Sequence, residues 1–275
     1  MNQIANYTTS YKFYYNKSIC FVASAKLGTR FFKKFITNKG WDSHIYPLNT
    51  EFNELEYDNQ EYWKPDYDGY FNYLKDTLIP NVDTIVFLIR HPYDRFCSGV
   101  STLLDIYNLR FFIYEETGVE FLRTNFPTNI SEEEFIIKAA EFRELIGEFY
   151  TTKNPDILKK IIFDYIVTET IYKDAHVERH HTLLYSFMNR CKEYNHNLKW
   201  LDLNNLDEYI TRKASININD EEHVFSKNSL KTSLPYDIIK NNLSAWKDEN
   251  NNLSLYLHIE SENYEKIKAE YEVLL

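Results

Sequence analysis

Two segments of this chain combine small, hydroxyl and basic residues in a way that suits binding of a phosphate or sulfate group. Residues 23–30 (ASAKLGTR) place Lys26, Gly28, Thr29 and Arg30 within one short loop. Gly28 allows the backbone to approach a ligand closely, Thr29 offers a hydroxyl donor, and the two basic side chains supply positive charge. Taken alone, the same loop also fits an ordinary strand-to-helix turn with solvent-facing basic residues.

The second segment, residues 90–98 (RHPYDRFCS), carries Arg90 at its start and Ser98 eight residues later. Pro92 is tolerated in the first turn of a helix, so a helix is predicted from this point. The apolar residues at helical spacing are Phe96, Val100, Leu103 and Leu104. We therefore expect Ser98 to lie off the apolar face, where it and Arg90 can point at one anion. In isolation, an Arg-Pro turn with a helix-surface serine is commonplace.

Each segment follows a run of strand length, 18–23 or 84–89, that is mostly apolar and suits a buried parallel strand. A loop that passes from such a strand into a helix directs free N–H groups and the positive end of the helix dipole at one place. Residues 198–202 resemble a third strand. Strands separated by helices predict an α/β fold, in three α/β/α layers around a central parallel sheet.

The rest of the chain predicts mainly helices. Ser131 and Glu134 form a capping box that opens one helix, residues 157–188 are largely helical, and residues 264–271 predict an amphipathic terminal helix. Residues 41–80 have weak periodicity and predict an insert of loops that covers the site. Since no Gly/Ser/Pro-rich stretch marks a linker, we expect one domain over residues 1–275.

Composition excludes several classes of protein. A formal net charge of -10 argues against general binding to nucleic acid, which depends on Lys and Arg contacts to phosphates. No apolar run approaches the roughly 20 residues that span a bilayer, so no membrane span is predicted. The three widely separated cysteines favour reduced thiols, with Cys20 and Cys97 in the core. These features together predict a cytoplasmic protein.

The two segments together resemble the cofactor loops of sulfotransferases. A Walker A loop is disfavoured for residues 23–30, because Lys26 precedes the only glycine of this segment, Gly28. The order Lys-x-Gly-Thr after a strand is similar to the 5′-phosphosulfate loop, Pro-Lys-x-Gly-[Thr/Ser]-[Thr/Ser], with Ala25 in place of proline and Arg30 in place of the last hydroxyl residue. Residues 90–98 resemble the 3′-phosphate loop, Arg-x-Pro-[Tyr/Phe]-[Asp/Glu]-Arg-x-x-Ser, particularly that of members acting on glycans.

This resemblance implies a P-loop-like sulfotransferase fold and transfer of the sulfuryl group of 3′-phosphoadenosine 5′-phosphosulfate (PAPS) to a hydroxyl or amine of an acceptor, with a carbohydrate favoured. It implies no metal. Lys26 would act at the bridging oxygen, and Arg90 and Ser98 would hold the 3′-phosphate. The cofactor-binding residues that the resemblance implies are Lys26, Leu27, Gly28, Thr29, Arg30, Arg90 and Ser98.

If the acceptor group is a hydroxyl, transfer also needs a general base to remove its proton. In the sulfotransferase family this base is a His or Glu between the two loops. The preferred candidates here are His44 and Glu54. The other candidates in the same region are Glu51, Asp66 and Asp68.

A histidine-rich segment further along the chain resembles the Asp-x-His-x-x-x-Gln segment of the glycan-type family, although its glutamine is absent. It contains His176 and His180, which would share a helical face and could hold a metal. No further cysteine or carboxylate at ligand spacing completes such a site, so contact with cofactor or acceptor is preferred.

Two other functions remain open: a nucleotide-dependent phosphotransferase, and a degenerate sulfotransferase fold that binds a glycan or protein without turnover. The missing Walker A loop argues against the first, and intact Lys26, Arg90 and Ser98 argue against the second. The sequence identifies neither the acceptor nor the oligomeric state.

Overall fold

The fold is given by a computed structural model of the chain. The residues that it describes are 12–15, 19–23, 42–45, 76, 82–113, 130–168, 176–177, 179–192, 197–206, 208–209 and 234–274. The chain divides into two compact units, the first from residues 1–92, 179–229 and 259–275, the second from residues 93–178 and 230–258. Both units are discontinuous in sequence, and the prediction of one domain stays a prediction.

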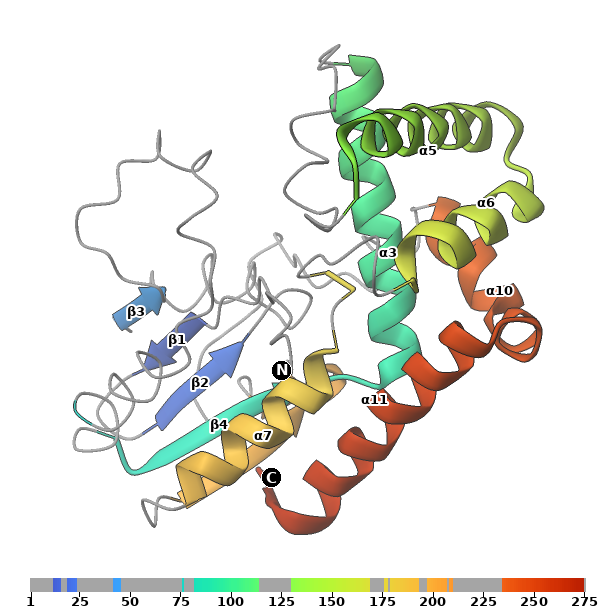
Figure 1. The fold of residues 1–275 in the computed structure, drawn as a ribbon. Coiled ribbons are helices and arrows are strands. Elements are labelled where there is room, and N and C mark those ends of the chain that lie inside the picture. Colours follow the sequence, from blue (N-terminus) through green and yellow to red (C-terminus); the bar gives the residue numbers. More distant parts are fainter. Residues whose placement is uncertain are drawn as a thin grey trace. The chain divides into compact units, whose positions relative to one another are not determined.

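The first unit contains a six-stranded sheet in the order β3-β1-β2-β4-β5-β6 (Figure 1). Strands β2, β4, β5 and β6 are parallel, whereas β1 and β3 are antiparallel to their neighbours. The bounds are β1 Lys12–Tyr15, β2 Ile19–Ala23, β3 Asp42–Ile45, β4 Thr84–Ile89, β5 Asn197–Asp202 and β6 Glu272–Val273. The parallel arrangement of these four strands is confirmed and is compatible with the predicted α/β fold, whereas the three-layer order and the P-loop-like sulfotransferase fold stay predictions.

The parallel strands form because their sequences are apolar on both faces. Ile85 to Ile89 in β4 are completely buried, as a strand between two parallel neighbours must be. Helix α7 (His180–Lys192) and the C-terminal half of α11 (Asn251–Glu270) cover the face that presents Cys20, Val22 and Phe87. The predicted burial of Cys20 is confirmed. The antiparallel strands β1 and β3 lie in segments where no strand was predicted.

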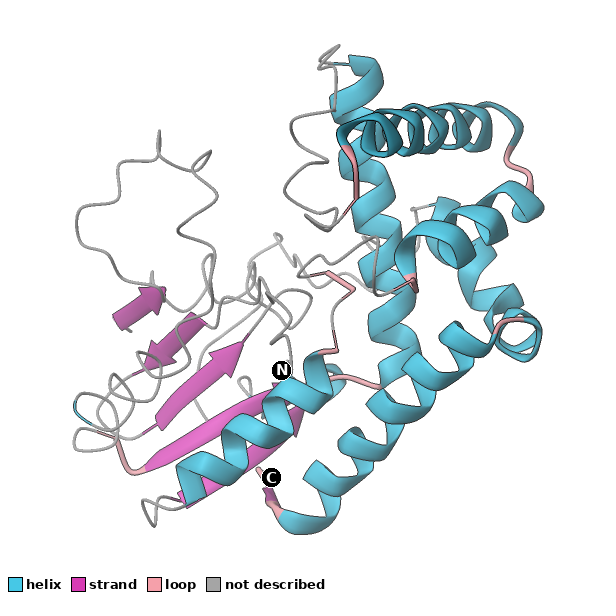
Figure 2. Ribbon diagram, in the orientation of Figure 1, coloured by secondary structure: helices cyan, strands magenta, loops and turns pink. Residues whose placement is uncertain are grey.

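The second unit is built from helices around its own apolar core (Figure 2). Aromatic rings fill the centre of this core: Phe142 lies 4.9 Å from Tyr165 and 5.2 Å from Tyr107, centroid to centroid. The elements are α3 Pro92–Asn108, the π-helical turn η6 Leu109–Ile113, α5 Glu132–Thr152, α6 Pro155–Ile161, the π-helical turn η7 Ile162–Ile166, α10 Leu234–Glu249 and the first part of α11.

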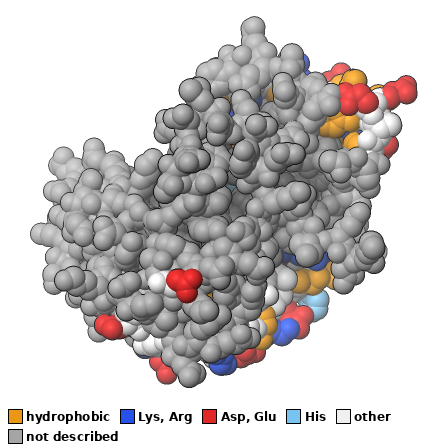
Figure 3. Space-filling model, turned by 60° about the vertical axis from the view of Figure 1, so that its left-hand side comes forward, with side chains coloured by type: hydrophobic (Ala, Val, Ile, Leu, Met, Phe, Trp, Pro, Cys, Tyr) orange, Lys and Arg blue, Asp and Glu red, His pale blue; other side chains and the backbone are white. Residues whose placement is uncertain are grey.

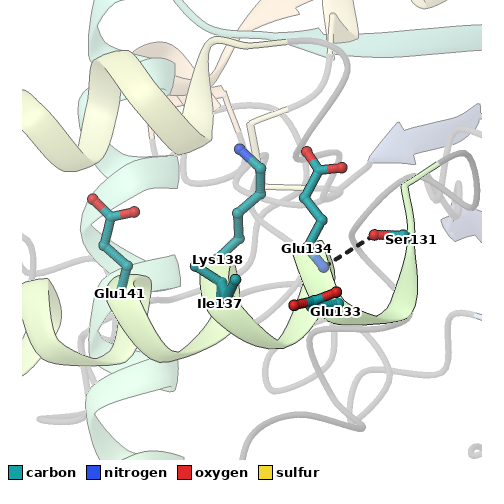
Figure 4. Close-up of a pocket in the computed structure, with 6 residues that line it drawn as sticks. All are labelled: Ser131, Glu133, Glu134, Ile137, Lys138 and Glu141. Carbon is teal, nitrogen blue, oxygen red and sulfur yellow. Dashed lines mark hydrogen bonds between the residues drawn. The ribbon is translucent and has the colours of Figure 1, made fainter.

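Local signals set several helix ends. The Ser131 hydroxyl accepts a hydrogen bond from the backbone N–H of Glu134 at 3.1 Å, so the predicted cap of α5 is confirmed (Figure 4). Asn154 caps α6 in the same way, and Pro155 occupies its first position. The stretch predicted to be largely helical, residues 157–188, contains most of α6, all of η7 and the first nine residues of α7.

Helix α3 begins at Pro92, as predicted, but it is not amphipathic near its start. Every residue from Arg95 to Ser101 is buried, including Ser98, which has an exposed fraction of only 1%. The expectation that Ser98 lies off the apolar face assumed that this part of the helix has one side exposed to solvent. Residues 95–101 have no such side. Cys97, at 2% exposed, is a core residue, as predicted.

Gly99 is required where α3 meets the turn at residues 176–177. A Cβ atom on Gly99 would lie 2.0 Å from the carbonyl oxygen of His176. The Tyr256 hydroxyl donates to the carbonyl of Val177 at 2.7 Å and holds the turn in place. Since the obstructing atom belongs to the backbone, it cannot swing aside as a side chain would.

We predict that Gly99→Ala lowers the free energy of unfolding by about 3 kcal/mol, at the upper end of overpacking costs. Gly147→Ala is the matched control, because its Cβ would meet only the exposed side chain of Phe112 at 2.9 Å. Because alanine favours the helix more than glycine does, the control variant should be as stable as the wild type or slightly more stable. Urea unfolding of the two variants measures the difference, and equal stability of both would contradict the close contact at Gly99.

Candidate functional site

The carboxyl ends of three parallel strands meet at one edge of the sheet in the first unit. The register pairs Val22 of β2 with Phe87 of β4, Phe87 with Trp200 of β5, and Ile89 with Asp202. In open α/β sheets ligands bind outside this edge, where the loops after neighbouring strands converge. The two motif-bearing segments therefore begin side by side, one after β2 and one after β4.

Arg90 is the first residue beyond β4 and is buried, with an exposed fraction of 6%. A guanidinium is placed in the interior only where anionic or carbonyl groups surround it. The next residue, His91, is exposed, and its ring packs edge-on against Tyr264 with centroids 5.7 Å apart. The end of β4 thus places a buried guanidinium at the carboxyl edge of the sheet.

Ser98 lies in the second unit, and its hydroxyl is a buried group in need of a partner. Its Oγ is inaccessible to solvent and has no hydrogen-bond partner among the residues that the structure describes. A buried hydroxyl left unsatisfied costs about 1–3 kcal/mol, so native proteins keep such groups mainly where a water or ligand completes them. The hydroxyl can donate to an oxygen atom of a water molecule or of an oxyanion.

Asp202 and Tyr264 order the edge of the sheet at the end of β5. The Tyr264 hydroxyl donates to Asp202 Oδ2 at 3.2 Å, and Asp202 Oδ1 accepts from the backbone N–H of Asn204 at 2.8 Å. The Tyr264 ring also packs edge-on against His181, with centroids 5.4 Å apart. One tyrosine therefore contacts His91 after β4, Asp202 at the end of β5 and His181 on α7.

Glu260 is a buried carboxylate, 1% exposed, that caps the N-terminus of α7. Its Oε2 accepts from the backbone N–H of His181 at 2.9 Å, and its Oε1 accepts from the backbone N–H and the hydroxyl of Thr182 at 3.2 and 3.1 Å. These donors and the positive end of the helix dipole compensate the buried negative charge.

The same carboxylate orients a histidine. His181 is fully buried, and its Nδ1 lies 2.9 Å from Glu260 Oε2. Its Nε2 is buried and has no hydrogen-bond partner among the described residues. A carboxylate–imidazole pair whose second ring nitrogen makes no hydrogen bond can bind a donor group of a ligand or transfer a proton. Glu260 was not singled out from the sequence, because it lies 79 residues from His181 and no local pattern links them.

Of the sequence-predicted site residues, Arg90 and Ser98 fall within the described structure. Residues 24–30, which include Lys26, Leu27, Gly28, Thr29 and Arg30, lie outside the described residues, as does Glu54. His44 is in β3, where its backbone pairs with Phe13 of β1, but its side chain lies outside the described residues. The roles assigned to these residues stay predictions.

The histidine pair considered as a metal site does not share a helix. His176 is in a turn, whereas His180 begins α7. Across the described residues the structure has no group of three or more His, Cys, Asp or Glu side chains that could hold a metal ion. None of the described helices is long and apolar enough to cross a membrane.

The described surface carries charges of both signs. Figure 3 shows acidic side chains at several separate places on one face, with basic side chains among them near its lower right edge. The helix α5 surface of the second unit is hollowed beside Ser131, Lys138 and Glu141, and two further acidic residues, Glu133 and Glu134, line this hollow (Figure 4). An acidic hollow repels anions, so it does not suit the ligand that the two loops indicate.

Comparison of the chain with protein-family models, curated proteins and solved structures gave no match.

We predict that Glu260→Ala lowers the free energy of unfolding by about 3–5 kcal/mol, because two backbone N–H groups and the His181 ring lose a buried acceptor. Glu265→Ala is the matched control on the same helix, since Glu265 is exposed and pairs only at the surface with Lys268. That control should change stability by under about 0.5 kcal/mol. Thermal and urea unfolding provide the comparison, and a Glu260 variant as stable as the control would refute the capping role.

Proposed function

We propose that this protein is a sulfotransferase that moves the sulfuryl group of PAPS to a hydroxyl or amine of an acceptor, with a carbohydrate as the favoured class. One observation carries the proposal: the segments that resemble the two cofactor loops follow β2 and β4, which are adjacent parallel strands. Loops in that position converge outside the carboxyl edge of the sheet, where nucleotides bind in α/β folds.

PAPS supplies an activated sulfuryl group, and the work of the protein is to position it and to stabilise negative charge. In the proposed assignment, Lys26 neutralises charge that develops on the bridging oxygen. Gly28, Thr29 and Arg30 hold the 5′-phosphosulfate through the backbone, a hydroxyl and a guanidinium. His44 and Glu54 remain the proposed general bases for a hydroxyl acceptor.

The sequence resemblance assigns the 3′-phosphate to Arg90 and Ser98. The burial of Arg90 at the end of β4 supports this assignment, because a desolvated guanidinium binds an oxyanion strongly. The buried Ser98 hydroxyl, which has no partner among the described residues, supports it independently. Neither feature is needed by an ordinary strand-to-helix turn with solvent-facing side chains.

We predict that the protein binds 3′-phosphoadenosine 5′-phosphate and that Arg90→Ala weakens this binding at least about 30-fold, because a charge-assisted hydrogen bond to the 3′-phosphate is lost. Isothermal calorimetry measures both affinities. Arg143→Ala, which removes an exposed arginine on α5, is the control for loss of charge and should bind as the wild type does.

If the wild-type protein does not bind 3′-phosphoadenosine 5′-phosphate, the sulfotransferase proposal is contradicted. Binding of ATP with Mg²⁺ in its place would favour a phosphotransferase.

We predict that Lys26→Ala retains affinity for 3′-phosphoadenosine 5′-phosphate within about threefold, since that product lacks the sulfuryl group, but lowers turnover of PAPS by about 10²–10³-fold. The measurement is release of 3′-phosphoadenosine 5′-phosphate from PAPS, with water or a mixture of sugars as acceptor. Lys138→Ala, on α5, serves as the matched lysine control. If the protein is a binding module without turnover, it will bind the nucleotide, but neither the wild type nor either variant will form 3′-phosphoadenosine 5′-phosphate from PAPS.

A further inference from the structure

The Glu260–His181 pair favours one tautomer of the imidazole ring. An ionised carboxylate only accepts hydrogen bonds, and Glu260 Oε2 lies 2.9 Å from His181 Nδ1. The ring therefore donates its proton at Nδ1, and in the neutral ring Nε2 keeps its lone pair. Because Glu260 also accepts from the backbone of His181 and from Thr182, the carboxylate cannot turn away from the ring.

Nε2 is an acceptor without a donor. It is closed to solvent and makes no hydrogen bond with any residue that the structure describes. The ring is held on another side by Tyr264, whose hydroxyl is engaged with Asp202. A buried acceptor in this state destabilises the fold unless a water molecule or a ligand donates to it.

The position of His181 indicates which ligand group can reach it. Tyr264 contacts the rings of both His181 and His91, and His91 directly follows Arg90. The pair thus lies at the same edge of the sheet as the arginine to which the proposed function assigns a 3′-phosphate. On a 3′-phosphorylated ribose, the group next to that phosphate is the 2′-hydroxyl, which is a hydrogen-bond donor.

We propose that His181 Nε2 accepts a hydrogen bond from the ribose 2′-hydroxyl of the bound nucleotide, and that Glu260 is the positioning residue that fixes the ring for this contact. The inference rests on the proposed function, because the nucleotide is its ligand. Since Nε2 is closed to solvent, neighbouring side chains must move aside when the ribose enters. The pair then distinguishes a ribonucleotide from a deoxyribonucleotide.

The test is calorimetry on the full chain with adenosine 3′,5′-bisphosphate and 2′-deoxyadenosine 3′,5′-bisphosphate. The wild type should bind the deoxy compound about five- to tenfold more weakly, the effect of one lost hydrogen bond. His181→Asn keeps an amide donor near Nδ1 for Glu260 but removes Nε2, and it should bind both compounds equally. His258→Asn, an exposed histidine on α11, should retain the wild-type preference.

Each outcome decides between the two proposals. Failure of the wild type to bind either nucleotide removes the proposed function, and this inference with it. Equal wild-type affinities, or an unchanged preference in His181→Asn, overturn the inference alone and assign Nε2 to a water molecule. If His181→Asn does not fold, ¹⁵N NMR of the wild-type ring decides: Nε2 should be unprotonated in the free protein and should shift with the ribonucleotide only, and a protonated Nε2 would overturn the assignment.

Discussion

The burial of β4 between two parallel neighbours is the constraint on which the first unit depends. Its side chains from Ile85 to Ile89 are apolar and fully buried, so its backbone polar groups must be paired on both sides. Because β2 and β5 run in the same direction as β4, their carboxyl ends meet at one edge of the sheet. Arg90 after β4 and Asp202 at the end of β5 take their places from that shared direction.

A single buried carboxylate then joins two helices that cover this sheet. Glu260 on α11 accepts hydrogen bonds from the first turn of α7, so the end of one helix is satisfied by the middle of another. The same group fixes the His181 ring, which means that the helix cap and the orientation of a candidate ligand-binding side chain are one interaction. Removing the carboxylate would therefore disturb both stability and the proposed ribose contact, whereas changing His181 to Asn separates the two.

The elements predicted best were those whose signal is local. The apolar runs at 84–89 and 198–202 appear as strands within one residue, and the cap at Ser131 and the start of α3 at Pro92 are where their residue types indicated. The strand β3, with the sequence DSHI, has no apolar run, and only pairing with β1 makes it extended. The burial of Ser98 was missed for a related reason, since a helix surrounded on all sides cannot be recognised from one apolar face.

Three of the four parallel strands (β2, β4 and β5), the ends of several helices and the order of the two segments that resemble sulfotransferase loops could be read from the sequence, because each depends on residues close together in the chain. The tertiary structure was needed to show that β6 joins the sheet, that β2 and β4 are neighbours, that Gly99 meets the carbonyl of His176, and that Glu260 holds His181. These contacts join residues tens of positions apart through backbone approach and hydrogen bonding. Their physical basis is the packing of completed elements, which leaves no periodic or local pattern in the chain.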